Sequence, residues 1–295
     1  MKRIVIIGLG DVSIYVIRGI LKTGKYKIVG MCDADIEKLH KFKTFTNKVF
    51  ADYRTMLRET TFDYIVLLVH QANRLELLLE LIQKGYQVFC EKPLVCSTEE
   101  LHLLTKACQK SDNYPIVMYH RSFSNRISEI YDLLEKTSVT KIEIFYLEDI
   151  KLQSSNNRYE SLTDYMGGGC IQDNFPNCVD FIFRYSDVEL TQVTKEKSHS
   201  GLYYEKAQIS LCLKKSNVQC TIFLSWNSPT DNKSVKIYEA NWVHYIDFQS
   251  GYDTPKESLI DEYQNLFAQT EWANAKSFFI KEKKITEMIE DILYE

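Results

Sequence analysis

The chain has 295 residues, of which 45% are hydrophobic, and its formal net charge is -4. This length suits two domains, and the apolar content is enough to bury a substantial core. Acidic and basic residues are interspersed, which argues against a nucleic-acid partner, because binding nucleic acid needs a basic patch that neutralises phosphates. No apolar run approaches the roughly 20 residues that span a bilayer. We therefore expect a soluble, cytoplasmic protein with no membrane partner.

The chain begins with a strand, a glycine turn and a helix in immediate succession. Residues 3–7 form a short, continuous run that is β-branched from Ile4 onward, typical of a strand buried on both faces of a parallel sheet. Gly8 permits a tight turn, and Gly10 lets the backbone approach phosphates. Ser13 replaces the third glycine of GxGxxG and is still small. The free N–H groups of the helix start suit a pyrophosphate. The residues predicted to bind it are Gly8, Gly10, Asp11, Val12 and Ser13.

A second strand is predicted over residues 26–32, and it ends at Asp33. An acid at this point can accept hydrogen bonds from the adenosine ribose, and it repels a 2′-phosphate. Asp33 therefore favours NAD as the cofactor, with NADP possible. The alternative is that Asp33 only caps the next helix, which is predicted to start near Asp35.

Strands and helices then alternate as far as residue 119. The expected helices cover residues 35–44, 55–59, 75–83 and 98–111, and the expected strands cover 64–69, 87–90 and 115–119. This alternation predicts a doubly wound parallel sheet that binds its ligand at the carboxyl ends of the strands. Gly8, Asp33, His70 and Glu91 all fall at those ends. We expect a dinucleotide-binding Rossmann domain over residues 1–120.

The second half of the chain, from residue 141, alternates polar and apolar residues. Strands are expected over residues 141–145, 188–194, 208–213, 218–226 and 235–248, and helices over 259–267 and 283–293. Such strands are typical of an antiparallel sheet with one buried face. The fold class is therefore α/β, with a C-terminal α+β domain over residues 121–295 and a largely antiparallel open sheet. The polar segment 151–165 is expected to be a substrate-facing loop.

Two motifs stand out against this pattern. Glu91, Lys92 and Pro93 follow the fourth strand, and residues 167–180 read GGGxxxDxxxNxxD. With these motifs the chain resembles the glucose–fructose oxidoreductase / inositol dehydrogenase (Gfo/Idh/MocA) family, whose second signature runs GGGxLxDxGxHxxD. The resemblance covers nearly the whole chain, including the order ADY…ML…FDYIVLLV…GYQVFCEKP.

The resemblance implies a role for each residue of the first motif. In the family, the motif lysine reaches the substrate hydroxyl or carbonyl near the nicotinamide, and the proline often fixes a cis or otherwise special turn; these positions are Lys92 and Pro93. A lysine ammonium stabilises the negative charge that hydride transfer builds on oxygen, and it can donate a proton. Glu91 could orient Lys92 through an ion pair. His70 falls where the family usually has a cofactor-lining proline. The alternative is a surface Glu–Lys pair before a turn proline.

The second motif is predicted to begin a helix at Asp173 that runs to about Arg184, with Pro176 in its first turn. On such a helix Asp173, Asn177 and Asp180 share one face, which can point at the nicotinamide. The alternative is that Asp173 caps the helix and Asp180 is a surface acid.

Asn177 departs from the family pattern, because the family has a proton-transferring histidine at this position. An amide can bind a substrate oxygen but does not exchange a proton at neutral pH. The acid or base must then be Lys92, Asp173, a tyrosine such as Tyr165, or water, and we rank the three residues in that order. His120, at the end of a predicted strand, is a further candidate.

The eight cysteines give no sign of a metal or redox site. None is spaced as CxxC, and no Cys/His cluster has zinc-ligand spacing. We therefore expect no metal, and small buried thiols that stay reduced. Cys170 and Cys178 lie inside the second motif, where packing is the expected role of both.

The leading hypothesis is an NAD(P)-dependent oxidoreductase that transfers a hydride between nicotinamide and a carbinol or carbonyl carbon of a sugar-like small molecule. The alternatives are an imine (C=N) reductase and a catalytically silent NAD(P)-binding sensor. In the family the open sheet packs against another subunit, so the resemblance implies a homodimer or homotetramer. Covering the domain's own helices is an equally simple role for the aromatic residues of these strands, which are Tyr203, Tyr204, Phe223, Trp226, Tyr238, Trp242 and Tyr245.

Overall fold

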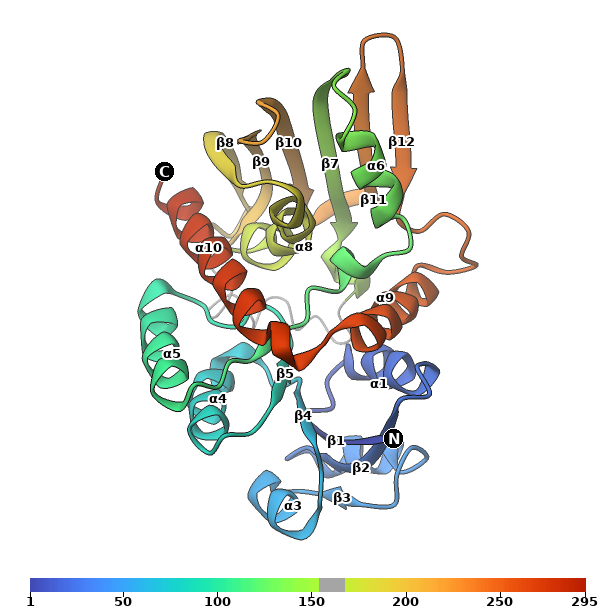
Figure 1. Ribbon diagram of the computed structural model, residues 1–295, viewed down its shortest axis with the longest axis vertical. Helices are drawn as coiled ribbons and strands as arrows, with labels where there is room; N and C mark the ends of the chain where they lie inside the picture. The colour runs from blue at the N-terminus through green and yellow to red at the C-terminus, as the bar shows by residue number, and fades with distance from the viewer. Residues whose placement is uncertain (154–167) are drawn as a thin grey trace. The chain divides into compact units, whose positions relative to one another are not determined.

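The computed structural model describes residues 1–153 and 168–295, and the chain divides into two compact units (Figure 1). The first unit contains Met1–Met118 and Leu259–Lys283, and the second contains Tyr119–Ser258 and Lys284–Glu295. The first change of unit, after Met118, lies next to the boundary expected at residue 120. The expected division differs in one segment, because residues 259–283 return to the first unit.

The sheet of the first unit has six parallel strands in the order β3-β2-β1-β4-β5-β6. The strands are β1 (Lys2–Ile7), β2 (Tyr26–Cys32), β3 (Val49–Phe50), β4 (Tyr64–Leu67), β5 (Val88–Cys90) and β6 (Ile116–Val117). The chain runs outward from β1 in both directions, so the predicted doubly wound sheet is confirmed. Ile4, Val5 and Ile6 have no exposed surface, as expected of a strand covered on both faces.

Three α-helices of the first unit begin at side-chain caps that the sequence supplies. The elements are α1 (Ser13–Lys22), α2 (Ile36–Phe42), α3 (Tyr53–Glu59), η1 (Gln71–Asn73), α4 (Arg74–Gln83), α5 (Thr98–Ser111), α9 (Pro255–Gln269), η3 (Trp272–Asn274) and α10 (Ala275–Tyr294), the last of which ends in the second unit. Asp35, Asp52 and Ser97 accept backbone hydrogen bonds at the starts of α2, α3 and α5.

Residues 259–283 belong to the first unit because α9 packs closely on α1 and on the sheet. A Cβ atom on Gly19 of α1 would lie 2.7 Å from the Cβ of Tyr263, so the glycine is what allows the two helices to touch. The hydroxyl of Tyr26 donates a hydrogen bond to the carbonyl of Phe267 at 2.9 Å. The Phe267 ring also packs on Phe89 of β5, with 4.9 Å between the ring centroids.

Glu80 links α3 to α4 and gives this unit a pH-dependent contribution to stability. Arg54, Lys84 and Tyr53 donate hydrogen bonds to its carboxylate at 2.6–2.7 Å, which lowers its pKa to about 2. This pKa lies below the ordinary value of 4.5. Ionised Glu80 therefore stabilises the fold fully above pH 4.5, and this contribution is lost as the pH falls toward 2.

We expect Glu80→Gln to lower the free energy of unfolding by about 1 kcal/mol at neutral pH, and by less near pH 3. The effect is small because Arg54 and Lys84 are more than half exposed. Denaturant titration of both proteins at each pH measures the difference. An equal difference in unfolding free energy at both pH values would contradict a pH-dependent contribution from Glu80.

The sheet of the second unit has six strands in the order β12-β11-β7-β10-β9-β8. They are β7 (Val139–Asp149), β8 (Val188–Lys197), β9 (Tyr204–Leu213), β10 (Val218–Ser225), β11 (Asn227–Glu239) and β12 (Val243–Asp247). Only the β7–β10 pair is parallel among these strands, so the largely antiparallel sheet is confirmed. The single strand expected over residues 235–248 is wrong: Glu239 and Trp242 exchange backbone hydrogen bonds that close a turn between two strands.

One long helix covers a face of this second sheet. The helical elements are η2 (His120–Phe123), α6 (Ile127–Leu134), α7 (Ile150–Gln153), α8 (Cys170–Tyr185) and the end of α10. Helix α8 contacts β7, β9 and β10, and its Phe175 and Phe181 are fully buried. The opposite faces of the same strands carry more exposed residues, such as Phe145 and Phe223. Among the helices in the described ranges, none is both long and apolar enough to cross a membrane.

Candidate active site

The first unit gathers its predicted site residues along one edge of the sheet. Gly8 directly follows β1, Asp33 follows β2, and Glu91 follows β5. His70 lies three residues beyond the end of β4. These are the carboxyl ends of adjacent parallel strands, which is where open α/β sheets bind their ligands.

The β1–α1 turn has two glycines with different roles. Gly8 has a φ of +95°, and a Cβ there would lie 2.7 Å from the backbone of Leu68 and Val69, so no other residue fits. At Gly10 a Cβ would meet no atom within 4 Å. The space beside Gly10 is therefore open on the side that a phosphate group would approach. The hydroxyl of Ser13 donates to the Gly10 carbonyl at 2.6 Å and holds the turn closed.

The start of α1 fits a pyrophosphate group. Its N-cap residue is Val12, which supplies no side-chain cap, and the first turn holds no acidic residue. The N–H groups of Ser13 and Tyr15 donate to backbone carbonyls here, and the partial positive charge of this helix end favours a bound anion. Asp11 is exposed at the tip of the turn.

The Asp33 carboxylate lies beside the glycine turn and has little exposed surface. One oxygen accepts the N–H of Leu9 at 2.7 Å, and the other accepts the N–H of Asp35 at 2.9 Å. The ammonium of Lys38 is 3.8 Å away. The side chain that caps α2 is Asp35, so the alternative role expected for Asp33, capping that helix, is not what the structure shows. A carboxylate has further lone pairs that can accept ribose hydroxyls.

Lys92 lies in a turn after β5, between two buried neighbours. Glu91 and Pro93 are buried, Lys92 is partly exposed, and the Lys92–Pro93 peptide bond is cis. The Glu91 carboxylate accepts a hydrogen bond from the hydroxyl of Tyr263 at 3.0 Å. Tyr263 was not expected here, because it lies 172 residues further along the chain.

His70 is exposed at the start of η1 and is uncharged at neutral pH. Its Nδ1 accepts the N–H of Ala72 at 3.4 Å at the start of η1. Desolvation lowers its pKa, and the charge of Arg74 lowers it further. His70 is therefore neutral at neutral pH and does not attract phosphates by charge.

In the second unit, α8 begins at Cys170, three residues before the expected start, so that expectation was wrong. Gly169 precedes the helix with a φ of +52°, and a Cβ there would lie 2.1 Å from the Tyr204 carbonyl oxygen. The glycine lets the helix start early, against β9. Pro176 consequently lies in the second turn rather than the first, where it lacks the N–H that would bond to the Gln172 carbonyl.

The motif residues of α8 share a face, as the spacing predicts. Asp173 is partly exposed, whereas Asn177 and Asp180 are each only 1% exposed. The Asp180 carboxylate accepts hydrogen bonds from the Ser122 hydroxyl and from Arg184 Nε. Asp180 is therefore a buried group that ties α8 to η2, and the alternative of a surface acid is wrong.

Asn177 is the most unusual of these side chains. Within the described part of the chain, neither its Nδ2 nor its Oδ1 atom has a hydrogen-bond partner. Leaving a buried amide unpaired costs about 1–3 kcal/mol per group, so such groups call for an explanation. A ligand oxygen that completes the pairing is one explanation, because the amide offers both a donor and an acceptor.

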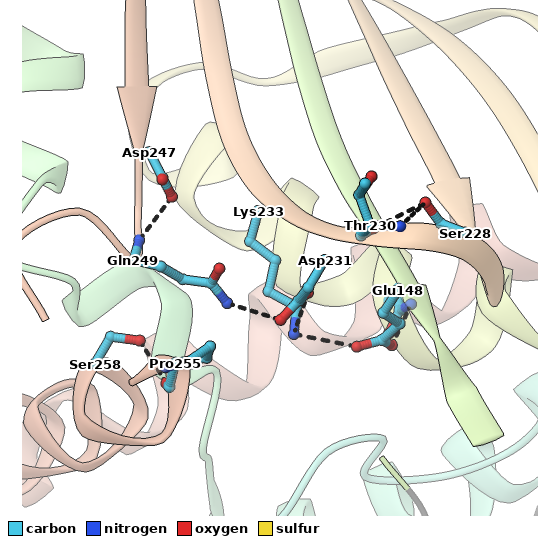
Figure 2. Close-up of polar contacts among 10 residues, drawn as sticks. Glu148, Ser228, Thr230, Asp231, Lys233, Asp247, Gln249, Pro255 and Ser258 are labelled. Atoms are coloured by element: carbon cyan, nitrogen blue, oxygen red, sulfur yellow. Dashed lines mark hydrogen bonds and ion pairs between the residues drawn. The ribbon is translucent and has the colours of Figure 1, made fainter. Parts of the chain in front are cut away.

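The sequence did not reveal a partly buried charge network next to α8 (Figure 2). Lys233 of β11 lies between Glu148 and Asp231, at 3.1 and 3.3 Å, and Asn174 of α8 donates to Glu148 at 2.9 Å. Burial alone would lower the pKa of Lys233, but Tyr146 and the two acids raise it above its usual value. Lys233 therefore stays charged at neutral pH, which suits a fixed cation and not a proton donor. Lys233 lies opposite Tyr146 in β7, and the sequence could have revealed the network only through this pairing, which joining each strand to the next one in the chain does not predict.

The remaining predicted residues fall into three groups. Cys170 and Cys178 are buried, and burial raises the pKa of Cys170, so packing fits both. His120 is buried in η2. Tyr165, and most of the segment expected to form a substrate loop, lie outside the described residues.

Residues 2–119 match the model of the Gfo/Idh/MocA family, an oxidoreductase family with an NAD-binding Rossmann fold. Over these residues the match confirms the resemblance predicted from the motifs. The match supports a nicotinamide cofactor.

The relatives found among curated proteins match only part of their length. The trans-1,2-dihydrobenzene-1,2-diol dehydrogenase of Xenopus laevis is 23% identical over 163 residues, which are 53% of this chain and 48% of that protein. The chain spans about half the length of the curated relatives it matches.

Solved structures match over nearly the whole chain. The myo-inositol 2-dehydrogenase of Lactobacillus plantarum has a TM-score of 0.82 at 15% identity, covering 99% of this chain and 96% of that one. An oxidoreductase of Agrobacterium radiobacter, solved with NAD+, L-tartaric acid and magnesium, has a TM-score of 0.76 at 13% identity, covering 98% and 94%. At 13% and 15% sequence identity, the similarity to these two structures shows a shared fold alone.

Proposed function

We propose that the protein is an NAD(P)-dependent oxidoreductase that transfers a hydride between nicotinamide and a carbinol or carbonyl carbon of a sugar-like small molecule. The observation that carries the proposal is the order of groups along one sheet edge. Asp33 follows β2, the Gly8 turn follows β1 and Lys92 follows β5, in the strand order β2-β1-β4-β5. A dinucleotide laid along this edge has its ribose at Asp33, its pyrophosphate at the glycine turn and its nicotinamide on the Lys92 side.

In this proposal each side chain has a limited task. The nicotinamide, when bound, supplies the hydride donor or acceptor. The Lys92 ammonium stabilises negative charge on the substrate oxygen and donates a proton to it in the direction of reduction. Asp173 and Asn177 lie in the second unit, and their hydrogen bonding to the substrate oxygen stays a prediction from the sequence, in which Asn177 moves no proton. Tyr165 remains a prediction from the sequence.

The names of the relatives suggest a substrate class. A dihydrobenzenediol and an inositol both carry neighbouring hydroxyl groups on a ring. We therefore propose a small cyclic substrate with adjacent hydroxyls. The test mixes purified protein with NAD+ and a panel of cyclic polyols, aldoses and trans-diols, and follows NADH formation. Turnover of at least one cyclic polyol supports the proposal, and binding of NADH without any turnover would reject it.

Gly10→Ala tests the cofactor site separately from folding. The added methyl meets no protein atom within 4 Å, so the free energy of unfolding should change by no more than about 1 kcal/mol. NADH affinity should fall at least about tenfold, because the methyl occupies the space that the pyrophosphate needs. Calorimetric titration measures the NADH affinity. The matched control is Gly24→Ala, which also has open space but has a φ of +65°. It should lose some stability and keep its NADH affinity; equal NADH affinity in both variants would count against the site.

Asp33→Asn tests the preference for NAD. We propose NAD as the natural cofactor because the Asp33 charge repels a 2′-phosphate. The asparagine side chain keeps an oxygen that can accept the Leu9 N–H, but it carries no charge. NADH affinity should fall by about tenfold, and NADPH affinity should rise, helped by Lys38 nearby. Fluorescence titration with both cofactors checks this. Asp35→Asn, which retains a good helix cap, is the control. An unchanged preference in Asp33→Asn would contradict the assignment.

One observation favours a second function, a catalytically silent cofactor-binding sensor. Asn177 stands where the resembled family has its proton-transferring histidine, and an amide does not replace that chemistry. The substrate panel decides between the two, because a sensor binds NADH yet turns over none of the polyols.

We also propose that the protein forms a homodimer or homotetramer through the sheet face of the second unit that α8 leaves uncovered. Phe145 and Phe223 stack there with 5.0 Å between ring centroids, beside a groove of about 650 Å³. Tyr203 and Trp226, which were also expected on such a surface, are buried. Sedimentation equilibrium tests the proposal, and a monomer at micromolar concentration would reject it.

A further inference from the structure

We propose that Arg74 is a positioning residue for Lys92, because its guanidinium holds the backbone on both sides of that lysine. The inference rests on the proposed function, in which Lys92 contacts the reacting oxygen. All the groups involved lie in the first unit.

Arg74 is the first residue of α4 and is only 3% exposed. Its Nε and Nη2 atoms donate to the Val69 carbonyl at 3.0 and 2.8 Å. Its Nη1 atom donates to the Glu91 carbonyl at 2.7 Å and also to the Pro93 carbonyl. One planar group therefore joins the segment after β4 to the turn after β5. A lysine could not do the same, because its single ammonium lacks the fixed fork of donors.

The two carbonyls that Nη1 holds belong to the residues immediately before and after Lys92. Moving the Lys92 backbone would break a hydrogen bond from a buried charged donor and leave a buried carbonyl unpaired, which is costly. The Glu91 side chain is held as well, through the hydroxyl of Tyr263. Lys92 is thus the partly exposed residue of a turn fixed at both flanks, which is the arrangement that a precisely aimed catalytic group needs.

The variants Arg74→Met and Arg74→Lys test the proposal by two readouts. Arg74→Met removes every donor at similar size, and Arg74→Lys retains the charge but not the fork. In hydrogen–deuterium exchange, the backbone amides between residues 91 and 96, except at Pro93, which has none, should exchange faster in Arg74→Met, while those of β1 and α1 exchange as in the wild type. With a substrate that the wild type turns over, kcat should fall roughly 10- to 100-fold. The dissociation constant of NADH should stay within about twofold, and Arg74→Lys should give intermediate values.

Arg54→Ala is the matched control. Arg54 donates to Glu80 of the same helix α4, but it contacts no carbonyl of the Lys92 turn. Hydrogen exchange in the Lys92 turn and kcat should both match the wild type.

Wild-type exchange at residues 91–96 in Arg74→Met would overturn the proposal. Faster exchange throughout the first unit would also overturn it, since that result means a general structural role. The exchange measurement needs no substrate. If the wild type binds NADH but turns over nothing, the proposed function fails, while exchange still decides whether Arg74 holds the turn. If Arg74→Met does not fold, Arg74→Lys carries the same comparison.

Discussion

Replacing Lys92 with methionine should lower kcat by roughly 10²- to 10⁴-fold, while the dissociation constant of NADH stays within about threefold of the wild type. The reason is that the ammonium acts on charge that develops on the substrate oxygen during hydride transfer, and it is not needed to hold the dinucleotide. Steady-state kinetics on the best polyol of the panel measures kcat, and calorimetric titration measures NADH binding. Methionine keeps most of the side-chain volume, so the turn between Glu91 and Pro93 should retain its packing.

Lys84→Met is the matched control for this experiment. Lys84 follows α4, is more than half exposed and pairs with Glu80. It should keep wild-type kcat and lose at most about 1 kcal/mol of stability. A Lys92→Met protein with full activity would remove this lysine from the mechanism, whatever its place at the end of β5.

Gly169→Ala should destabilise the protein by about 3–5 kcal/mol, the largest stability effect that we expect from a single methyl group in this chain. Two costs act together at this position. The backbone has a φ of +52°, and the new Cβ would lie 2.1 Å from the Tyr204 carbonyl oxygen. Because the obstacle is backbone in β9, the start of α8 must shift, and Asp173 shifts with it. Urea denaturation followed by circular dichroism measures the loss.

Gly201→Ala separates these two costs. Gly201 also has a positive φ, of +73°, but a Cβ there meets nothing within 4 Å. It should cost only about 1 kcal/mol. Equal losses in the two variants would mean that the contact with Tyr204 contributes nothing.

The first unit was largely predictable, because its signals are local. A β-branched run followed at once by Gly8 and Gly10 predicts the first strand and its turn. Asp33 was predictable in the same way, because it directly follows the second predicted strand. Helix α5 begins and ends at the expected residues, since Ser97 supplies an N-cap and the helical spacing of apolar residues continues to Ser111. The family resemblance added Lys92 and Pro93, which composition alone would leave as a surface pair and a turn.

What the sequence did not reveal are contacts between residues far apart along the chain. Tyr263 reaches Glu91 across 172 residues, and Lys233 meets Glu148 because β11 pairs with β7 and not with β10, the strand before it in the chain. Arg74 reads in sequence as an ordinary polar residue at a helix start. Its role depends on three carbonyl groups that only the folded backbone brings together. Local periodicity carries no information on such pairings.

The early start of α8 illustrates the same limit at short range. Pro176 suggests a helix that begins within the preceding few residues, and Asp173 resembles an N-cap. The actual start at Cys170 depends on the fit of Gly169 against β9, which is a tertiary contact.

A crystal structure with NADH and a non-reactive polyol decides whether the cofactor and Lys92 meet as proposed. We expect the pyrophosphate beside Gly10 at the start of α1, the adenosine ribose at Asp33, and the Lys92 ammonium within hydrogen-bond distance of the polyol oxygen nearest the nicotinamide. A cofactor bound elsewhere, or a Lys92 ammonium that points away from both ligands, would contradict it.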